Sequence, residues 1–344
     1  MPNPDHDSFP SAKRGWPKDA VALDNCRANI KRESSRPETG HVLVMNGDRH
    51  TSGIEAATAL EASGEYRLLR KLGKRRHFCA PDGTPTKLAL VLDVETTGLN
   101  RGSDQVIELG MVKFAFSADG RVFEVVDEFT ALREPSCLIP AVITELTGIS
   151  AEMVAGQRID ADQVARFIGD AVLVIAHGAA FDRPFCETLI PAFADKHWAC
   201  SNTEVDWQAR RHRGSKLTYL LNDMGFFYEG HRGLDDSYAL LEVLAATTPH
   251  AAGTALGALL QTARKATVRI WAQAAPFEHK DTLKARGYRW SDGSGDALKA
   301  WWKDVDEADA EAELAYLRSD IYQNADVDLP TKRFTSLQRF SARI

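Results

Sequence analysis

Leu88-Ala-Leu-Val-Leu-Asp-Val-Glu-Thr-Thr-Gly-Leu-Asn100 is an apolar run that ends in two acids separated by one residue. Pro and Gly bound the run on both sides, so it predicts a buried β-strand. Side chains alternate along a strand, which places Asp93 and Glu95 on one face and Val94 in the core. Two neighbouring carboxylates at the end of a buried strand repel each other, and a divalent cation with oxygen ligands would relieve that repulsion. The alternative is a strand end whose acids simply face solvent.

Length and composition set the broad class. The 344 residues are 44% hydrophobic and 26% charged, which predicts one main globular domain with smaller additions. The formal net charge of −6 gives no general attraction for nucleic acid, so such a partner would need a local basic surface or bound metal ions.

The cysteines and the apolar runs bear on location. The five cysteines include no Cys-x-x-Cys pair, which favours reduced thiols in the cytosol. The chain starts without a signal-peptide pattern, and no apolar run approaches ~18 residues. We therefore expect a cytoplasmic protein with no membrane partner.

The order of elements predicts the fold class. Strand patterns at residues 106–116 and 121–129 flank the turn residues Asp119 and Gly120, which predicts an antiparallel meander. Alternating helices and a further buried strand at residues 171–176 follow. Together they predict an α/β fold with a mixed sheet flanked by helices.

Two later segments carry further candidate side chains. Asp182 follows the strand at residues 171–176, at the edge of the sheet where ligands usually bind, although an acid there could simply cap the next helix. His231 lies in a loop between glycines, just before a helix that starts with Asp235 and Asp236. Helical spacing does not decide which of these two acids faces the sheet.

Taken jointly, these segments resemble a known family. Asp93-Val-Glu-Thr-Thr-Gly-Leu99, Ala176-His-Gly-Ala-Ala-Phe-Asp182 and His231-Arg-Gly-Leu-Asp-Asp236 are similar to the motifs of the DEDD 3′→5′ exonucleases, with Leu146-Thr-Gly-Ile149 between the first two. The similarity is to the histidine subtype (DEDDh), which includes the epsilon subunit of bacterial DNA polymerase III and RNase T. It implies a ribonuclease H-like fold and assigns the last acid to Asp236.

The resemblance also implies a chemistry. The protein would be a 3′→5′ exonuclease that releases nucleoside monophosphates from single-stranded or frayed DNA or RNA 3′ ends, using two Mg²⁺ or Mn²⁺ ions. Asp93, Glu95 and Asp236 would hold one ion. Asp93 would bridge to the second, which Asp182 supports, and His231 would take the proton of the attacking water. The family also implies that Thr96 and Leu99 meet the 3′-terminal nucleotide, although Leu99 could be a core residue.

One position departs from the family pattern. Gly178 stands where the family commonly has asparagine, so a side-chain amide that could orient the backbone or the substrate is missing. This supports an alternative function, a catalytically weak module that holds 3′ ends or docks a polymerase or other partner. A glycine needed for a positive φ angle would be another explanation.

The remaining segments complete the expected organisation. We expect disorder at residues 1–40, a helical extension at 41–85, the exonuclease domain at 86–250, a linker helix at 251–265, a small α+β module at 266–324 and a flexible basic tail at 325–344. The extension should continue as a helix through Tyr66–Leu72, and its basic residues either contact phosphates or form a solvated face. In the module, aromatic residues interleaved with basic ones could stack bases or form its core, and a protein partner is also possible.

Overall fold

The computed structural model describes residues 49–248, 250–293 and 298–343. The segment 1–40, for which we expect disorder, lies outside the described residues. The chain divides into two compact units, Met1–Ala56 and Ala57–Ile344. Of the first unit only the start of helix α1 (Arg49–Ala62) is described. In the part of the chain that is described, no helix combines the length and apolarity needed to cross a membrane.

A five-stranded mixed sheet is the centre of the second unit. Its order is β4-β3-β2-β5-β6, with β2 antiparallel to β3, β3 antiparallel to β4, and β5 and β6 parallel to β2. The strands are β2 (Thr86–Thr96), β3 (Val106–Ser117), β4 (Val122–Leu132), β5 (Val174–Ala176) and β6 (Trp198–Cys200). The predicted antiparallel meander is therefore confirmed, as is the mixed direction of the sheet.

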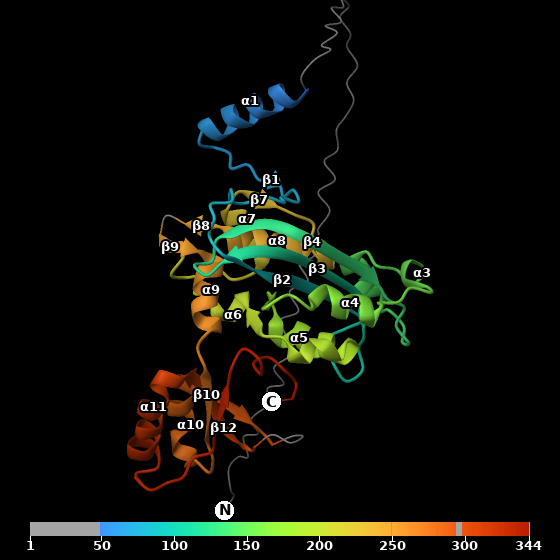
Figure 1. Cartoon of the computed structure of the whole chain (residues 1–344). Helices are drawn as coiled ribbons and strands as arrows, with labels where there is room; N and C mark the ends of the chain where they lie inside the picture. The colour runs from blue at the N-terminus through green and yellow to red at the C-terminus, as the bar shows by residue number, and fades with distance from the viewer. Residues whose placement is uncertain (1–48, 249, 294–297, 344) are drawn as a thin grey trace, which may run out of the picture. The chain divides into compact units, whose positions relative to one another are not determined.

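Helices cover both faces of this sheet (Figure 1). Apolar residues of β2 alternate between the two cores: Val91 packs toward α7, α8 and α9, and Leu92 packs toward α4 and α5. The helices are α4 (Ala161–Ile168), α5 (Ala179–Leu189), α7 (Leu217–Asp223), α8 (Gly233–Ala245) and α9 (Ala255–Ala263). This arrangement is the ribonuclease H-like fold class expected from the sequence.

Shorter elements connect these layers. They are α2 (Ala141–Thr147), α3 (Ala151–Val154), α6 (Ser201–Glu204), β7 (Phe226–Phe227), β8 (Thr247–Thr248) and β9 (Ala251–Thr254). Helix α2 follows Pro140 and ends at Gly148, whose φ of 71° is a left-handed C-cap.

A close backbone contact sets the position of α8. A Cβ placed on Gly110 of β3 would lie 2.0 Å from the carbonyl carbon of Gly233, the first residue of α8. A Cβ on Gly233 would in turn lie 3.0 Å from the carbonyl oxygen of Asp93. Only glycines allow the amino end of α8 to approach the sheet this closely.

The segment before the sheet differs from the sequence-based prediction. Tyr66–Leu72 is not helical: strand β1 (Arg70–Lys71) pairs in parallel with β7, and Leu72 packs on the core. A tertiary strand pairing replaces the helix that the spacing predicts, because residues 226–227 offer an open edge. The basic residues mostly form ion pairs, Lys71–Glu229, Lys74–Asp235, Arg75–Glu242 and Arg76–Glu128. They attach this segment to the sheet domain rather than forming a free cationic surface.

A second sheet follows α9. It has the order β11-β12-β10-β13 and is antiparallel throughout. Its strands are β10 (Thr267–Ala272), β11 (Arg289–Ser291), β12 (Ala300–Asp306) and β13 (Thr331–Phe334), with helices α10 (Lys280–Ala285) and α11 (Ala310–Tyr316). Ile270 on one face packs with Leu283 and Leu314 of the helices, and Trp301 joins this core. Trp271 and Trp302 lie on the opposite face, because they sit one residue out of phase with Ile270 and Trp301.

The final segment packs against the domain as far as it is described, to Arg343, which differs from the flexible basic tail expected there. The carbonyl oxygen of Ser336, which follows β13, accepts the backbone N–H of Trp198 at 2.8 Å. The guanidinium of Arg183, which is fully buried, donates to the carbonyl oxygens of Leu337 and Arg339 at 2.7 Å each. A buried cation needs such partners, so the final segment is part of the fold.

The glycine contact between β3 and α8 gives a first prediction. Gly110→Ala should lower the free energy of unfolding by more than about 2 kcal/mol, because the added methyl group forces backbone apart in a packed core. Gly73→Ala is the matched control, since a Cβ there meets no atom within 4 Å. Urea unfolding of both variants measures the effect, and equal stabilities would contradict the assigned role of this contact.

Candidate active site

Two carboxylates stand at the end of strand β2. Asp93 and Glu95 lie on the face that packs against α8, and Val94 between them is buried in the opposite core. The alternation expected from the sequence is thus confirmed. The strand ends at Thr96, where the pairing register with β3 shifts, and the chain turns away from the sheet.

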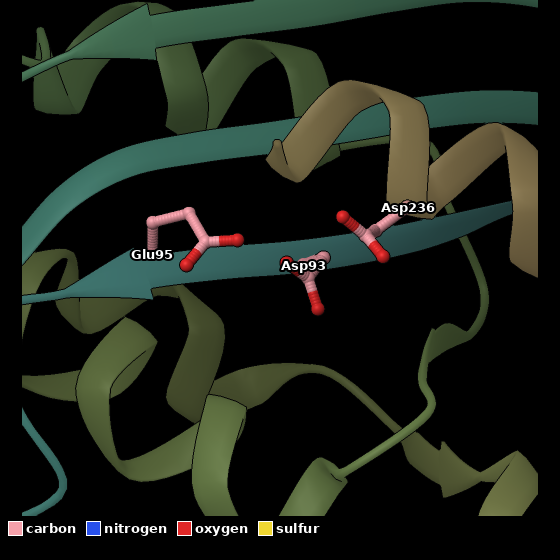
Figure 2. A group of neighbouring side chains, drawn as sticks. All are labelled: Asp93, Glu95 and Asp236. Carbon is pink, nitrogen blue, oxygen red and sulfur yellow. The ribbon is translucent and has the colours of Figure 1, made fainter. Parts of the chain in front are cut away.

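Asp236 joins these two acids from α8. Each of the three side chains offers one carboxylate oxygen, and these oxygens all lie within 4.8 Å of one another. Figure 2 shows Asp236 reaching from the helix toward Asp93 and Glu95 on the strand. Asp235 instead pairs with Lys74 at 3.1 Å. The structure thus places Asp236, and not Asp235, in the cluster, a choice that helical spacing does not decide.

Asp182 faces the same cavity from another element. It is 3% exposed and lies in the first turn of α5, whose N-cap is Gly178. The capping role considered for Asp182 is therefore wrong, because the helix begins earlier than the sequence pattern suggests. The cavity is about 310 Å³, and its lining includes all four acids and His231. Asp182 stands outside the group of three oxygens, beside the backbone N–H of Val94, which hydrogen-bonds to it.

Burial raises the pKa of all four acids, and repulsion from neighbouring carboxylates adds to the increase for Asp93, Glu95 and Asp182. The pKa of Asp93 lies well above its usual value because burial and the charge of Asp182 disfavour ionisation. Burial, with the charge of Asp236, raises the pKa of Glu95 to about 8. Burial raises the pKa of Asp182 to about 7 and also raises that of Asp236, against a hydrogen bond from Tyr228. The chain thus holds several acids in a place that disfavours their charge.

This donor set fits a hard divalent cation. The three clustered ligands are carboxylate oxygens, which Mg²⁺ and Mn²⁺ prefer over softer donors. A bound cation would also relieve the repulsion that raises these pKa values. The four acids could therefore hold metal ions.

The loop before α8 presents His231 to the cavity. His231 is exposed and has a φ of +67°, an unusual backbone conformation for a residue other than glycine. Its neighbour Arg232 makes a two-pronged ion pair with Glu108, at 2.8 Å in its shortest contact. Glu108 is 1% exposed and also accepts the backbone N–H of Gly233 at 2.9 Å. These contacts fix the conformation of the loop.

Sequence reasoning missed three supporting side chains. Glu108 and Arg232 hold the His231 loop, and the hydroxyl of Tyr228 donates to Asp236 at 2.8 Å. The sequence did carry a signal for Glu108, since it is an acid within a largely apolar strand. Tyr228 had none, because only the fold brings it to Asp236.

Thr96 and Leu99 both line the cavity, as their motif suggests. Thr96 is buried and donates its hydroxyl to the carbonyl oxygen of Gly98 at 2.6 Å. Leu99 is 77% exposed, so the alternative of a core leucine is wrong. An exposed leucine at the rim is free to contact a ligand.

Comparisons with known proteins agree with this geometry. Residues 90–244 match the RNase T family model, described as an exonuclease. The PolC-type DNA polymerase III of Clostridium perfringens is 36% identical over 243 residues, covering 65% of this chain and 16% of that protein. Its Bacillus subtilis counterpart is 40% identical over 99 residues, covering 28% of this chain and 6% of that protein. The chain thus spans a small part of the length of these relatives.

Solved structures show weaker likenesses. Escherichia coli exonuclease I in complex with a dA13 oligonucleotide has a TM-score of 0.43 at 15% identity, covering 64% of this chain and 63% of that one. The nuclease domain of 3′hExo bound to rAMP has a TM-score of 0.35 at 20% identity, covering 45% of this chain and 88% of that one.

The acidic centre lies within the matched part of the chain, since Asp93, Glu95, Asp182 and Asp236 all fall between residues 90 and 244. Residues 90–244 are thus similar to the exonuclease family in sequence.

The raised pKa values give a prediction for the metal-free protein. These acids bind protons more tightly in the folded chain than in the unfolded chain, whose carboxyl groups titrate near about 4. Their stabilising contribution is therefore full below about pH 4 and is lost as pH rises through the folded values, which reach about 8 for Glu95. In EDTA, unfolding in urea should require at least about 1 kcal/mol less at pH 8 than at pH 5. Mg²⁺ or Mn²⁺ should restore stability at pH 8.

Two variants isolate the cluster in that experiment. Asp93→Asn should flatten the pH dependence, because it removes one of the repelling carboxylates. Asp235→Asn, an adjacent acid paired with Lys74, should keep the wild-type slope. Identical slopes in all three proteins would show that the cluster does not govern stability in this pH range.

Gly178 gives the next prediction. Its φ is −122°, so a positive φ angle does not explain this glycine. A Cβ would lie 3.5 Å from a carboxylate oxygen of Asp182, an ordinary contact, and asparagine is a favourable N-cap. Gly178→Asn should therefore fold with an unchanged or slightly raised Tm. Gly178→Ala, which adds the Cβ without the amide, is the control. A lower Tm for the asparagine variant than for the alanine variant would contradict the capping argument.

Proposed function

We propose that this protein is a divalent-metal-dependent 3′→5′ exonuclease that releases nucleoside monophosphates from single-stranded or frayed 3′ ends of DNA or RNA. The observation that carries the proposal is the convergence of Asp93, Glu95 and Asp236, from β2 and α8, in one cavity with Asp182 and His231. The exonuclease family match over residues 90–244 supports it. The names of the PolC-type relatives place the same kind of domain in DNA polymerases, but those proteins are far longer.

In this proposal each side chain has a role. Asp93, Glu95 and Asp236 would hold one Mg²⁺ or Mn²⁺ ion, and Asp93 would share in holding a second, which Asp182 would support. When bound, two such ions would activate a water molecule and neutralise charge on the phosphodiester oxygens. His231 accepts the proton of that water, and the Glu108–Arg232 ion pair keeps its loop in place. Thr96 positions the terminal nucleotide through its backbone, and Leu99 contacts its base.

The proposal also covers the residue bounds of the catalytic domain and the compartment of the protein. We assign the chemistry to residues 86–250 and place the protein in the cytoplasm. The four cysteines among the described residues, Cys79, Cys137, Cys186 and Cys200, are free thiols, which suits that compartment.

A cleavage assay tests the proposal. Oligonucleotides of DNA and of RNA, each labelled at the 5′ end, should shorten stepwise from the 3′ end with Mg²⁺ or Mn²⁺ and stay intact in EDTA. Asp93→Ala and Asp236→Ala should abolish the reaction. His231→Ala should slow it by roughly 10²–10⁴ while metal binding is kept. Asp235→Ala is the matched control and should stay active, since Asp235 pairs with Lys74 outside the cluster.

The outcomes separate the two candidate functions. Full activity of Asp93→Ala would falsify the assigned metal site. Binding of 3′ ends without metal-dependent release of mononucleotides would instead favour the weak 3′-end-binding or docking module, for which Gly178 is the supporting feature.

A further inference from the structure

A cleft runs between the exonuclease domain and the outer face of the second sheet. It has a volume of about 480 Å³, within the range of pockets that hold small ligands. Its lining includes Arg101 and Ala180 of the exonuclease domain, Arg269, Arg289 and Trp302 of the second sheet, and Arg339 of the final segment.

The cleft is positively charged although the chain is acidic. The lining holds three acids, and each is ion-paired: Glu204 with Arg339, Asp304 with Arg269 and Asp306 with Lys265. Two lining arginines, Arg101 and Arg289, form no ion pair among the described residues. Both are exposed. Two uncompensated guanidinium groups therefore face the cleft, one on each wall.

One wall combines this charge with an aromatic surface. Two guanidinium groups, one from each neighbouring strand, lie over the ring of Trp302 in β12. Arg269 is 4.1 Å and Arg289 is 4.8 Å from the ring centroid. Arg269 is held by both oxygens of Asp304, so its position is fixed. Arg289 has no such partner among the described residues and can turn its N–H groups toward an anion. Arginine planes and aromatic rings on an open sheet face suit stacked bases and phosphates.

The cleft adjoins the catalytic cavity. Ala180 lines the cleft, and its neighbours Phe181 and Asp182 line the catalytic cavity. On the other side, Arg101 follows the rim residue Leu99 by two positions. The start of α5 and the loop after β2 thus contribute residues to both cavities.

We propose that this cleft holds the single-stranded nucleic acid on the 5′ side of the nucleotide being cleaved, with Arg101 and Arg289 contacting its phosphates. The inference rests on the proposed exonuclease function. Two basic residues on the helical side of the second sheet are engaged elsewhere. Arg286, on that helical side, is committed to Glu313, and Lys280 lies over Phe277.

Substitutions on the full chain test the proposal, because removing the second sheet would also remove the segment that binds Arg183. Arg289→Glu and Arg101→Glu change one wall each. Lys284→Glu is the matched control: it makes the same charge change on α10, at an exposed lysine with no ion pair among the described residues. Equal Tm values would show that all three variants fold.

The measurement is fluorescence anisotropy with labelled strands of DNA and of RNA, of roughly 30 and 4 nucleotides, in Ca²⁺ and across a salt series. Each arginine variant should bind the long strand at least about fivefold more weakly, and the log–log salt slope should flatten by roughly 0.7 per lost phosphate contact. The advantage of the long strand over the short one should shrink. Lys284→Glu should match the wild type.

The outcomes distinguish this inference from the proposed function. If the arginine variants bind long strands as the wild type does, the cleft assignment is wrong even where cleavage is observed. If the wild type binds long strands through the arginines but does not cleave them, the cleft assignment stands and the exonuclease proposal fails. Binding of neither DNA nor RNA would overturn both. Tighter binding of DNA than of RNA, or the reverse, would identify the preferred substrate.

Discussion

The contact between Gly110 and Gly233 is the constraint on which the site depends. It brings the amino end of α8 against β3, directly beside Asp93 on β2. Three residues into the helix from Gly233, Asp236 then meets the two acids of the strand. Any larger residue at either glycine would separate helix from sheet, and the three carboxylates would no longer share one position. The close backbone contact therefore determines where the three carboxylates come together.

That gathering of charge is unfavourable by itself. Burial raises the pKa values of all four acids, and mutual repulsion adds to the increase for Asp93, Glu95 and Asp182, so the surrounding fold has to hold them together. Neighbouring side chains partly offset this unfavourable charge. Tyr228 donates a hydrogen bond to Asp236, and Arg232 neutralises the nearby Glu108. A metal-binding centre has this character, since the energy stored in the repulsion is released when a cation binds.

The flanking segments are bound into the domain through charged contacts. On the amino side, Lys74 and Arg75 pair with Asp235 and Glu242 of α8, and so brace the helix that carries Asp236. On the carboxyl side, the final segment closes over the buried Arg183, which is adjacent in sequence to Asp182. Both flanking segments thus contact elements that carry acids of the cavity.

The sequence by itself determined the elements and most of the acidic site. Alternation along residues 88–96 placed Asp93 and Glu95 on one face, and the motif spacing, through its family resemblance, selected Asp182, His231 and Asp236. These are local properties, set by the period of a strand and by short stretches of chain. Only the tertiary structure decided which contacts link distant segments. The pairing of β1 with β7 replaced a predicted helix, and the last residues became the partner of Arg183. The tyrosine on Asp236 and the arginine cleft likewise depend on residues far apart in the chain, whose proximity no local pattern encodes.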